Sequence, residues 1–138
     1  MHYIITANDY HTLNDISHPE FKLFAAHNVD DYGRELFGEV KTSIEKISSN
    51  RLITINKNRY SAFVGTDLEL KLRERNITEL YLCGVVTSIC VMQTAIDAYN
   101  KGFKINILEK ACMDAENECH MFAIEYMKKV LNANIIEA

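Results

Sequence analysis

Short apolar runs alternate with helical patterns along most of this chain of 138 residues. The apolar runs predict strands at residues 3–7, 52–56, 79–85, 103–108 and 135–136. Apolar residues at helical spacing predict helices over residues 33–47, 90–100 and 117–131, and a further helix that begins near residue 67 and ends near residue 76. Strands that alternate with helices predict an α/β fold with a doubly wound, Rossmann-like parallel sheet. The length predicts one domain over residues 1–138.

The charge balance and the apolar pattern exclude several classes of partner. The chain has 15 Lys and Arg against 19 Asp and Glu, whereas proteins that bind nucleic acid by neutralising phosphates are normally basic. No apolar run approaches the ~20 residues that cross a bilayer, and the N-terminus lacks the features of a signal peptide. None of the four cysteines has C-x-x-C spacing. We therefore expect a reduced, cytoplasmic protein with no nucleic-acid or membrane partner.

Polar side chains follow three of the predicted strands. The first strand runs into Asp9 and His11, the second into Lys57, and the third into Cys90. In a parallel sheet with right-handed crossovers the carboxyl ends of the strands share one edge, which is where α/β proteins place their sites. The sequence therefore predicts a site at this edge.

Cys90 stands where the third strand gives way to the predicted helix. Backbone N–H groups at a helix start favour an anion, so they would stabilise a thiolate and could hold an oxyanion. The alternative is a buried cysteine without a chemical role, since cysteine is often buried. Of the others, we expect Cys83 to lie in the core and Cys112 and Cys119 to be structural.

The polar stretch that begins at Asp9 contains a possible set of metal ligands. Asp9, His11, Glu20 and His27 offer two carboxylates and two imidazoles, which suit Zn, Fe or Mn. The spacing alone also fits an ordinary solvated loop, and Lys57 alone also fits a surface charge. We expect His18 to be a loop residue. We expect His120 to serve packing or capping.

Several segments, taken in order, resemble the isochorismatase-like cysteine hydrolases, and among them the nicotinamidases (pyrazinamidases). The segments are residues 57–63 (KNRYSAF), 65–68 (GTDL), 84–91 (GVVTSICV) and 94–100 (TAIDAYN). Residues 18–28 (HPEFKLFAAHN) are similar to the metal loop of the bacterial nicotinamidases.

The resemblance implies a role for each matching position. Cys90 would be the nucleophile that forms a thioester with a linear amide, and Lys57 the catalytic lysine. A cis peptide bond would join Val85 and Val86, and the N–H groups of Val86 and Cys90 would face the oxyanion. The residues that would hold a divalent metal, most simply zinc, are Asp9, His11, Glu20 and His27, and those that would flank the substrate ring are Phe24 and Tyr60. Nicotinamide would yield nicotinate and ammonia in NAD salvage.

One departure from the family pattern concerns its opening. The family begins with a central strand that ends in a general-base Asp, followed by a helix, and this sequence has no counterpart of that unit. We therefore expect a truncated member, weak or inactive by itself, because loss of a general base costs about 10²–10⁴-fold. Exposed strand edges would also favour a homo-oligomer. Hydrolysis of another small amide, or a non-enzymatic interaction subunit, are the alternatives.

Overall fold

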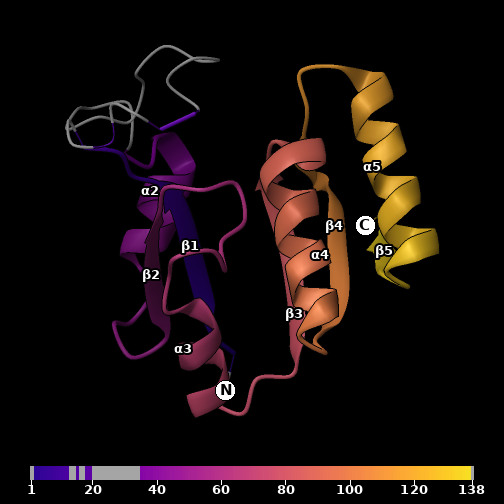
Figure 1. Cartoon of the computed structure of the whole chain (residues 1–138). Coiled ribbons are helices and arrows are strands. Elements are labelled where there is room, and N and C mark those ends of the chain that lie inside the picture. Colours follow the sequence, from indigo (N-terminus) through magenta and orange to yellow (C-terminus); the bar gives the residue numbers. More distant parts are fainter. Residues whose placement is uncertain (1, 13–14, 16–17, 20–34, 138) are drawn as a thin grey trace. The chain divides into compact units, whose positions relative to one another are not determined.

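The computed structural model describes residues 2–12, 15, 18–19 and 35–137. Figure 1 shows an α/β chain in which strands and helices alternate, as the sequence predicts. The chain divides into two compact units, a first unit of residues 1–59 and a second unit of residues 60–138. The expectation of one domain over residues 1–138 stays a prediction.

The first unit contains a two-stranded parallel sheet and one short helix. Strand β1 (Ile4–Asp9) pairs with β2 (Leu52–Lys57) in a register that runs from Ile4 opposite Leu52 to Asp9 opposite Lys57. Helix α2 (Gly38–Glu45) is shorter than the predicted helix over residues 33–47, and none of its residues is buried. The apolar spacing therefore predicted where this helix lies, but it did not predict that none of its side chains is buried.

The second unit contains a three-stranded sheet in which all strands are parallel, in the order β3-β4-β5. Its elements are β3 (Glu79–Val85), β4 (Lys104–Met113), β5 (Asn134–Ile136) and the helices α3 (Leu68–Glu74), η3 (Thr87–Val91), α4 (Met92–Asn100) and α5 (Asn117–Val130). In Figure 1, α4 lies over β3 and β4. Side chains with no exposed surface gather between the helices α4 and α5 and the sheet, and they include Ala95, Ala98, Ile107, Ala123 and Met127. This core supports the turn between β3 and α4.

Local signals explain where two helices of the second unit start and stop. Thr66 and Glu69 have the spacing of a capping box at the start of α3, but it forms only in part. Thr66 Oγ1 accepts a hydrogen bond from Leu68 N, while Glu69 pairs with Arg73 and Lys101. Gly102 follows α4 with a φ of +84°, which is the left-handed conformation that favours glycine after a helix.

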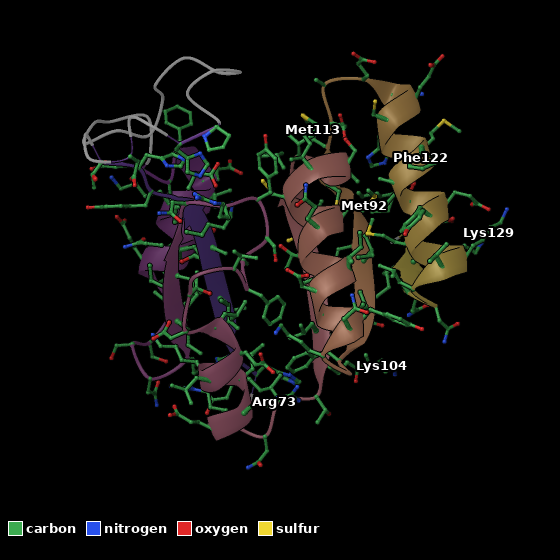
Figure 2. All side chains as sticks on the ribbon, in the orientation of Figure 1. Arg73, Met92, Lys104, Met113, Phe122 and Lys129 are labelled. Atoms are coloured by element: carbon green, nitrogen blue, oxygen red, sulfur yellow. The ribbon has the colours of Figure 1, made fainter. Side chains whose placement is uncertain are left out.

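Helix α3 is tied to the turn after α4. Arg73, labelled in Figure 2, places its guanidinium 4.3 Å from the centroid of the Phe103 ring and donates a hydrogen bond to the carbonyl of Lys101. Phe103 also stacks on Phe63 with the ring centroids 5.9 Å apart. These contacts hold the segment after Tyr60 against the end of α4.

One face of β3 stays exposed within the second unit. Tyr81, Cys83 and Val85 alternate along the strand and are all exposed, and Val85 retains 66% of its accessible surface. The expectation that Cys83 lies in the core is therefore wrong: the opposite face of β3 is the one that packs on the helices. Among the described residues, no helix is both long and apolar enough to cross a membrane.

Candidate active site

Asp9 and Lys57 meet at the carboxyl ends of β1 and β2. They stand opposite each other in the register, and the Lys57 ammonium forms an ion pair with Asp9 Oδ1. Lys57 Nζ also donates a hydrogen bond to the carbonyl of Arg59, at 3.1 Å. Only 5% of the Lys57 side chain is exposed, so the ammonium is not an ordinary surface charge. The prediction that these two strand ends share one edge is confirmed.

His11 lies in the same unit, next to two residues that the sequence did not single out as ligands. It is buried, and its ring meets that of the buried His18 edge to face with centroids 5.0 Å apart. Asp15 Oδ2 lies 3.9 Å from His11 Nδ1 and accepts a hydrogen bond from Thr12 N. His18 is a loop residue, as expected, but it is buried and packs against His11.

The set of four metal ligands stays a prediction. Glu20, His27 and the ring-binding candidate Phe24 lie outside the described residues. Within the described ranges no three His, Cys, Asp or Glu side chains come together as a metal site. The donor chemistry does fit a transition metal, because Asp9 and the buried His11 supply a carboxylate and an imidazole from one short segment.

Cys90 lies in the second unit, inside the turn that connects β3 to α4. This turn is the short helix η3, which begins at Thr87 and is wound more widely than an α-helix. The Val86 carbonyl accepts hydrogen bonds from both Ile89 N, at 3.1 Å, and Val91 N, at 3.3 Å. The helical winding thus begins three residues before Cys90, which corrects the expected start at Cys90. The peptide bond between Val85 and Val86 is cis, as the resemblance implies.

Hydrogen bonds from α5 and from the end of β4 reach this turn. Thr87 Oγ1 lies 2.9 Å from His120 Nδ1, and Ser88 N donates to Asp114 Oδ2 at 2.8 Å. Met113, labelled in Figure 2, is the last residue of β4 and comes immediately before Asp114. No sequence pattern pointed to Asp114, and for His120 we expected only packing or capping.

The segment that follows Tyr60 is fixed to α4 by hydrogen bonds. Ser61 Oγ donates to Asp97 Oδ2 at 2.5 Å, and Ala62 N donates to Thr94 Oγ1 at 3.0 Å. Cys90 lies in η3, and Thr94 and Asp97 lie in α4, which follows it directly, so the thiol and the anchors of the Tyr60 segment share one continuous helical stretch. Their spacing of four and seven residues after Cys90 indicates a shared helix face, but it does not identify Ala62 and Ser61 as their partners.

The other thiols are held in their protonated form. Partial burial raises the pKa of Cys83, although that residue as a whole is exposed. Burial also raises the pKa of Cys112. Partial burial and the nearby carboxylates of Glu116 and Asp114 raise the pKa of Cys119. These three cysteines are thus poor candidates for a nucleophile.

The parallel sheet and the cysteine turn after β3 define the class, an α/β protein with a thiol at a strand-to-helix turn. The isochorismatase domain matches residues 5–137, so the chain belongs to the isochorismatase family. An isochorismatase family protein of Bacillus subtilis (strain 168), PncA, is 43% identical over 137 residues, which are 98% of this chain and 75% of the relative.

The chain is also similar to solved structures, and the descriptions of these relatives name an enzyme activity. A nicotinamidase/pyrazinamidase from Bacillus subtilis has a TM-score of 0.94 and 45% identity, over 98% of this chain and 75% of that one. A pyrazinamidase of Pyrococcus horikoshii, in complex with zinc, has a TM-score of 0.83 and 30% identity, over 99% of this chain and 75% of that one.

Proposed function

We propose that this chain is a nicotinamidase-type amidohydrolase, which converts nicotinamide into nicotinate and ammonia through a thioester on Cys90. The observation that carries the proposal is the cysteine turn between β3 and α4. Its Val85–Val86 cis bond matches what the resemblance implies. The solved relatives described as nicotinamidase/pyrazinamidase support the choice of amide. Hydrolysis in the cytoplasm, as a step of NAD salvage, belongs to the same proposal.

In the first half of the reaction the Cys90 sulfur attacks the carboxamide carbon. The negative charge that develops on the amide oxygen would be met by the N–H groups of Val86 and Cys90, which act as an oxyanion hole. The C–N bond then breaks, the thiol proton ends on the departing nitrogen, and ammonia leaves a nicotinoyl thioester. Water cleaves this thioester in the second half and restores the thiol.

The first unit would contribute charge and substrate orientation. The buried Lys57 ammonium would stabilise negative charge that develops during the reaction, while its pairing with Asp9 fixes where the ammonium lies. Asp9, His11, Glu20 and His27 would hold a divalent metal, for which zinc is the choice that the Pyrococcus relative supports. Such a metal would bind the pyridine nitrogen and orient the ring, and Phe24 and Tyr60 would flank that ring.

The test is release of ammonia from nicotinamide by the zinc-loaded protein. We expect turnover that Cys90→Ala abolishes and that the matched variant Cys83→Ala retains. Benzamide, which lacks the ring nitrogen, should be a poor substrate. No turnover, with Cys90 still rapidly alkylated, would indicate a weak or inactive family member. Faster turnover of another small amide would change the substrate and keep the mechanism.

A further inference from the structure

We propose that His120 and Asp114 are positioning residues, which hold the turn that carries Cys90 and thereby set the reactivity of its thiol. We call these two side chains, with their partners Thr87 and Ser88, the turn clasp. The inference rests on the proposed role of Cys90 as nucleophile and adds the residues that would keep it in place. Every contact of the turn clasp lies within the second unit.

The first contact joins the start of η3 to α5. Thr87 is fully buried, with 0% of its surface exposed, and its hydroxyl lies 2.9 Å from His120 Nδ1. Leaving a buried hydroxyl without a hydrogen-bond partner costs free energy, so this contact stabilises the observed position of Thr87. Thr87 stands three residues before Cys90 in the same short helix, so a shift of Thr87 would carry the thiol with it.

A carboxylate on β4 faces the other nitrogen of the His120 ring. Glu109 Oε1 lies 3.8 Å from His120 Nε2, whereas the Thr87 hydroxyl lies at Nδ1. The imidazole therefore links strand β4, helix α5 and the cysteine turn.

The second contact comes from the loop after β4. Asp114 Oδ2 accepts a hydrogen bond from Ser88 N at 2.8 Å, and Oδ1 accepts one from Glu116 N at 3.4 Å. Burial acts to raise the pKa of Asp114, but hydrogen bonds from the Ser88 side chain and from nearby backbone N–H groups outweigh it and lower the pKa. Asp114 is thus an anion at neutral pH, and its bond to Ser88 is charge-assisted.

Together the two contacts restrain successive residues of the turn from two different elements. Thr87 is held by α5 and Ser88 by the loop after β4, while Val86 caps the winding through its carbonyl. The turn cannot rotate without breaking at least one of these bonds. Since misplacing a reacting group by about 1 Å can cost ~10²-fold in rate, this restraint bears directly on the thiol.

Two matched pairs of variants test the turn clasp. His120→Asn keeps a polar atom near the Nδ1 position, whereas His120→Gln keeps one near the Nε2 position and loses the Thr87 contact. Thr87→Ser keeps the hydroxyl, whereas Thr87→Val keeps the shape and loses the hydroxyl. The readouts are the rate of Cys90 alkylation by iodoacetamide, followed by mass spectrometry, hydrogen exchange of residues 86–92, and the melting temperature.

We expect His120→Gln and Thr87→Val to slow Cys90 alkylation about tenfold and to speed exchange across residues 86–92. His120→Asn and Thr87→Ser should stay within about twofold of the parent. The double variant Thr87→Val with His120→Gln should be no slower than either single variant, because both remove the same bond.

Two results would overturn the inference. One is an unchanged alkylation rate in Thr87→Val and His120→Gln, even with a lower melting temperature, since that is what a merely structural role predicts. The other is equal slowing in all four variants. If Cys90 in the parent protein is alkylated no faster than Cys119, the proposal that Cys90 is the nucleophile fails. The alkylation rates of the variants relative to the parent, and the hydrogen exchange of residues 86–92, still test the turn clasp in that case.

Discussion

The two units bury different kinds of side chain around their candidate site residues. In the second unit most buried side chains are apolar, as with Leu72 and Ile107, although Asn106 and Thr87 are buried there too. In the first unit His11, His18 and Lys57 are as deeply buried as Ile53 and Ile55. Buried polar groups are costly without partners, so the first unit depends on contacts such as the ion pair of Lys57 with Asp9, where the second depends mainly on apolar packing. The difference teaches that the turn carrying the thiol stands on an apolar core, with hydrogen bonds added at Thr87 and Ser88, whereas the proposed metal site depends on buried polar and charged groups.

The largest effect should come from the core of the second unit. Leu72→Ala removes a fully buried side chain from α3 and should lower the free energy of unfolding by about 2–5 kcal/mol, measured by urea denaturation. Leu70→Ala, on the exposed side of the same helix, is the matched control and should stay within about 0.5 kcal/mol. Val40→Ala on α2 should have an equally small effect on the free energy of unfolding. A decrease as large as that of Leu72→Ala would contradict the difference in burial between the two units.

Removal of a charge next to His11 should weaken zinc binding by the first unit. Asp15→Asn takes away the carboxylate that faces His11 Nδ1, and loss of such an outer partner typically costs about 10–100-fold in metal affinity. Competition with a chromogenic chelator measures the affinity. Asp67→Asn, in the second unit, is the control that should bind zinc as tightly as the parent. Equal affinity in Asp15→Asn and the parent would show that this carboxylate does not act on the metal site.

A smaller loss of stability should follow from the Ser61 anchor. Ser61 is buried, and Ser61→Ala leaves the Asp97 carboxylate without its hydroxyl donor, at a cost of about 1–3 kcal/mol. The double variant Ser61→Ala with Asp97→Asn should lower the free energy of unfolding by less than the sum of the two single changes. Strict additivity in urea denaturation would show that the bond between these side chains contributes nothing.

The smallest effect should be a pH-dependent one at Asp114. Because the folded-state pKa of Asp114 lies below its ordinary value of 3.8, its ionised form stabilises the fold at neutral pH, and this contribution is lost as the pH falls below that value. Asp114→Asn should therefore lower the melting temperature by about 3 °C at pH 7. The gap from the parent should shrink towards pH 3, and a gap that grew in acid would contradict the lowered pKa.

The sequence predicted the sheet and its main apolar contacts well, because both follow from periodicity. The order of elements and the positions of the helices near residues 67–76 and 117–131 were predicted correctly. Such patterns report which face of an element is apolar. They do not report how much of that face other elements cover, which is why Cys83 on β3 proved exposed.

Contacts between distant polar residues were the part that the sequence could not supply. Asp97 reaches Ser61 across 36 positions and His120 reaches Thr87 across 33, and no periodicity signals bonds of that separation. The start of η3 at Thr87 was also missed, because its wider winding departs from the α-helical spacing on which the prediction relied. The roles of Cys90, Lys57 and the metal set stay predictions.

The most direct test of the account is to trap the thioester on Cys90. The zinc-loaded protein is mixed with nicotinamide, quenched in acid within one turnover and digested for mass spectrometry. The account predicts one nicotinoyl group on the peptide that contains Cys90, and none in Cys90→Ala. Ammonia release by the parent protein with no acylated Cys90, or an acyl group on Cys83, Cys112 or Cys119, would contradict it.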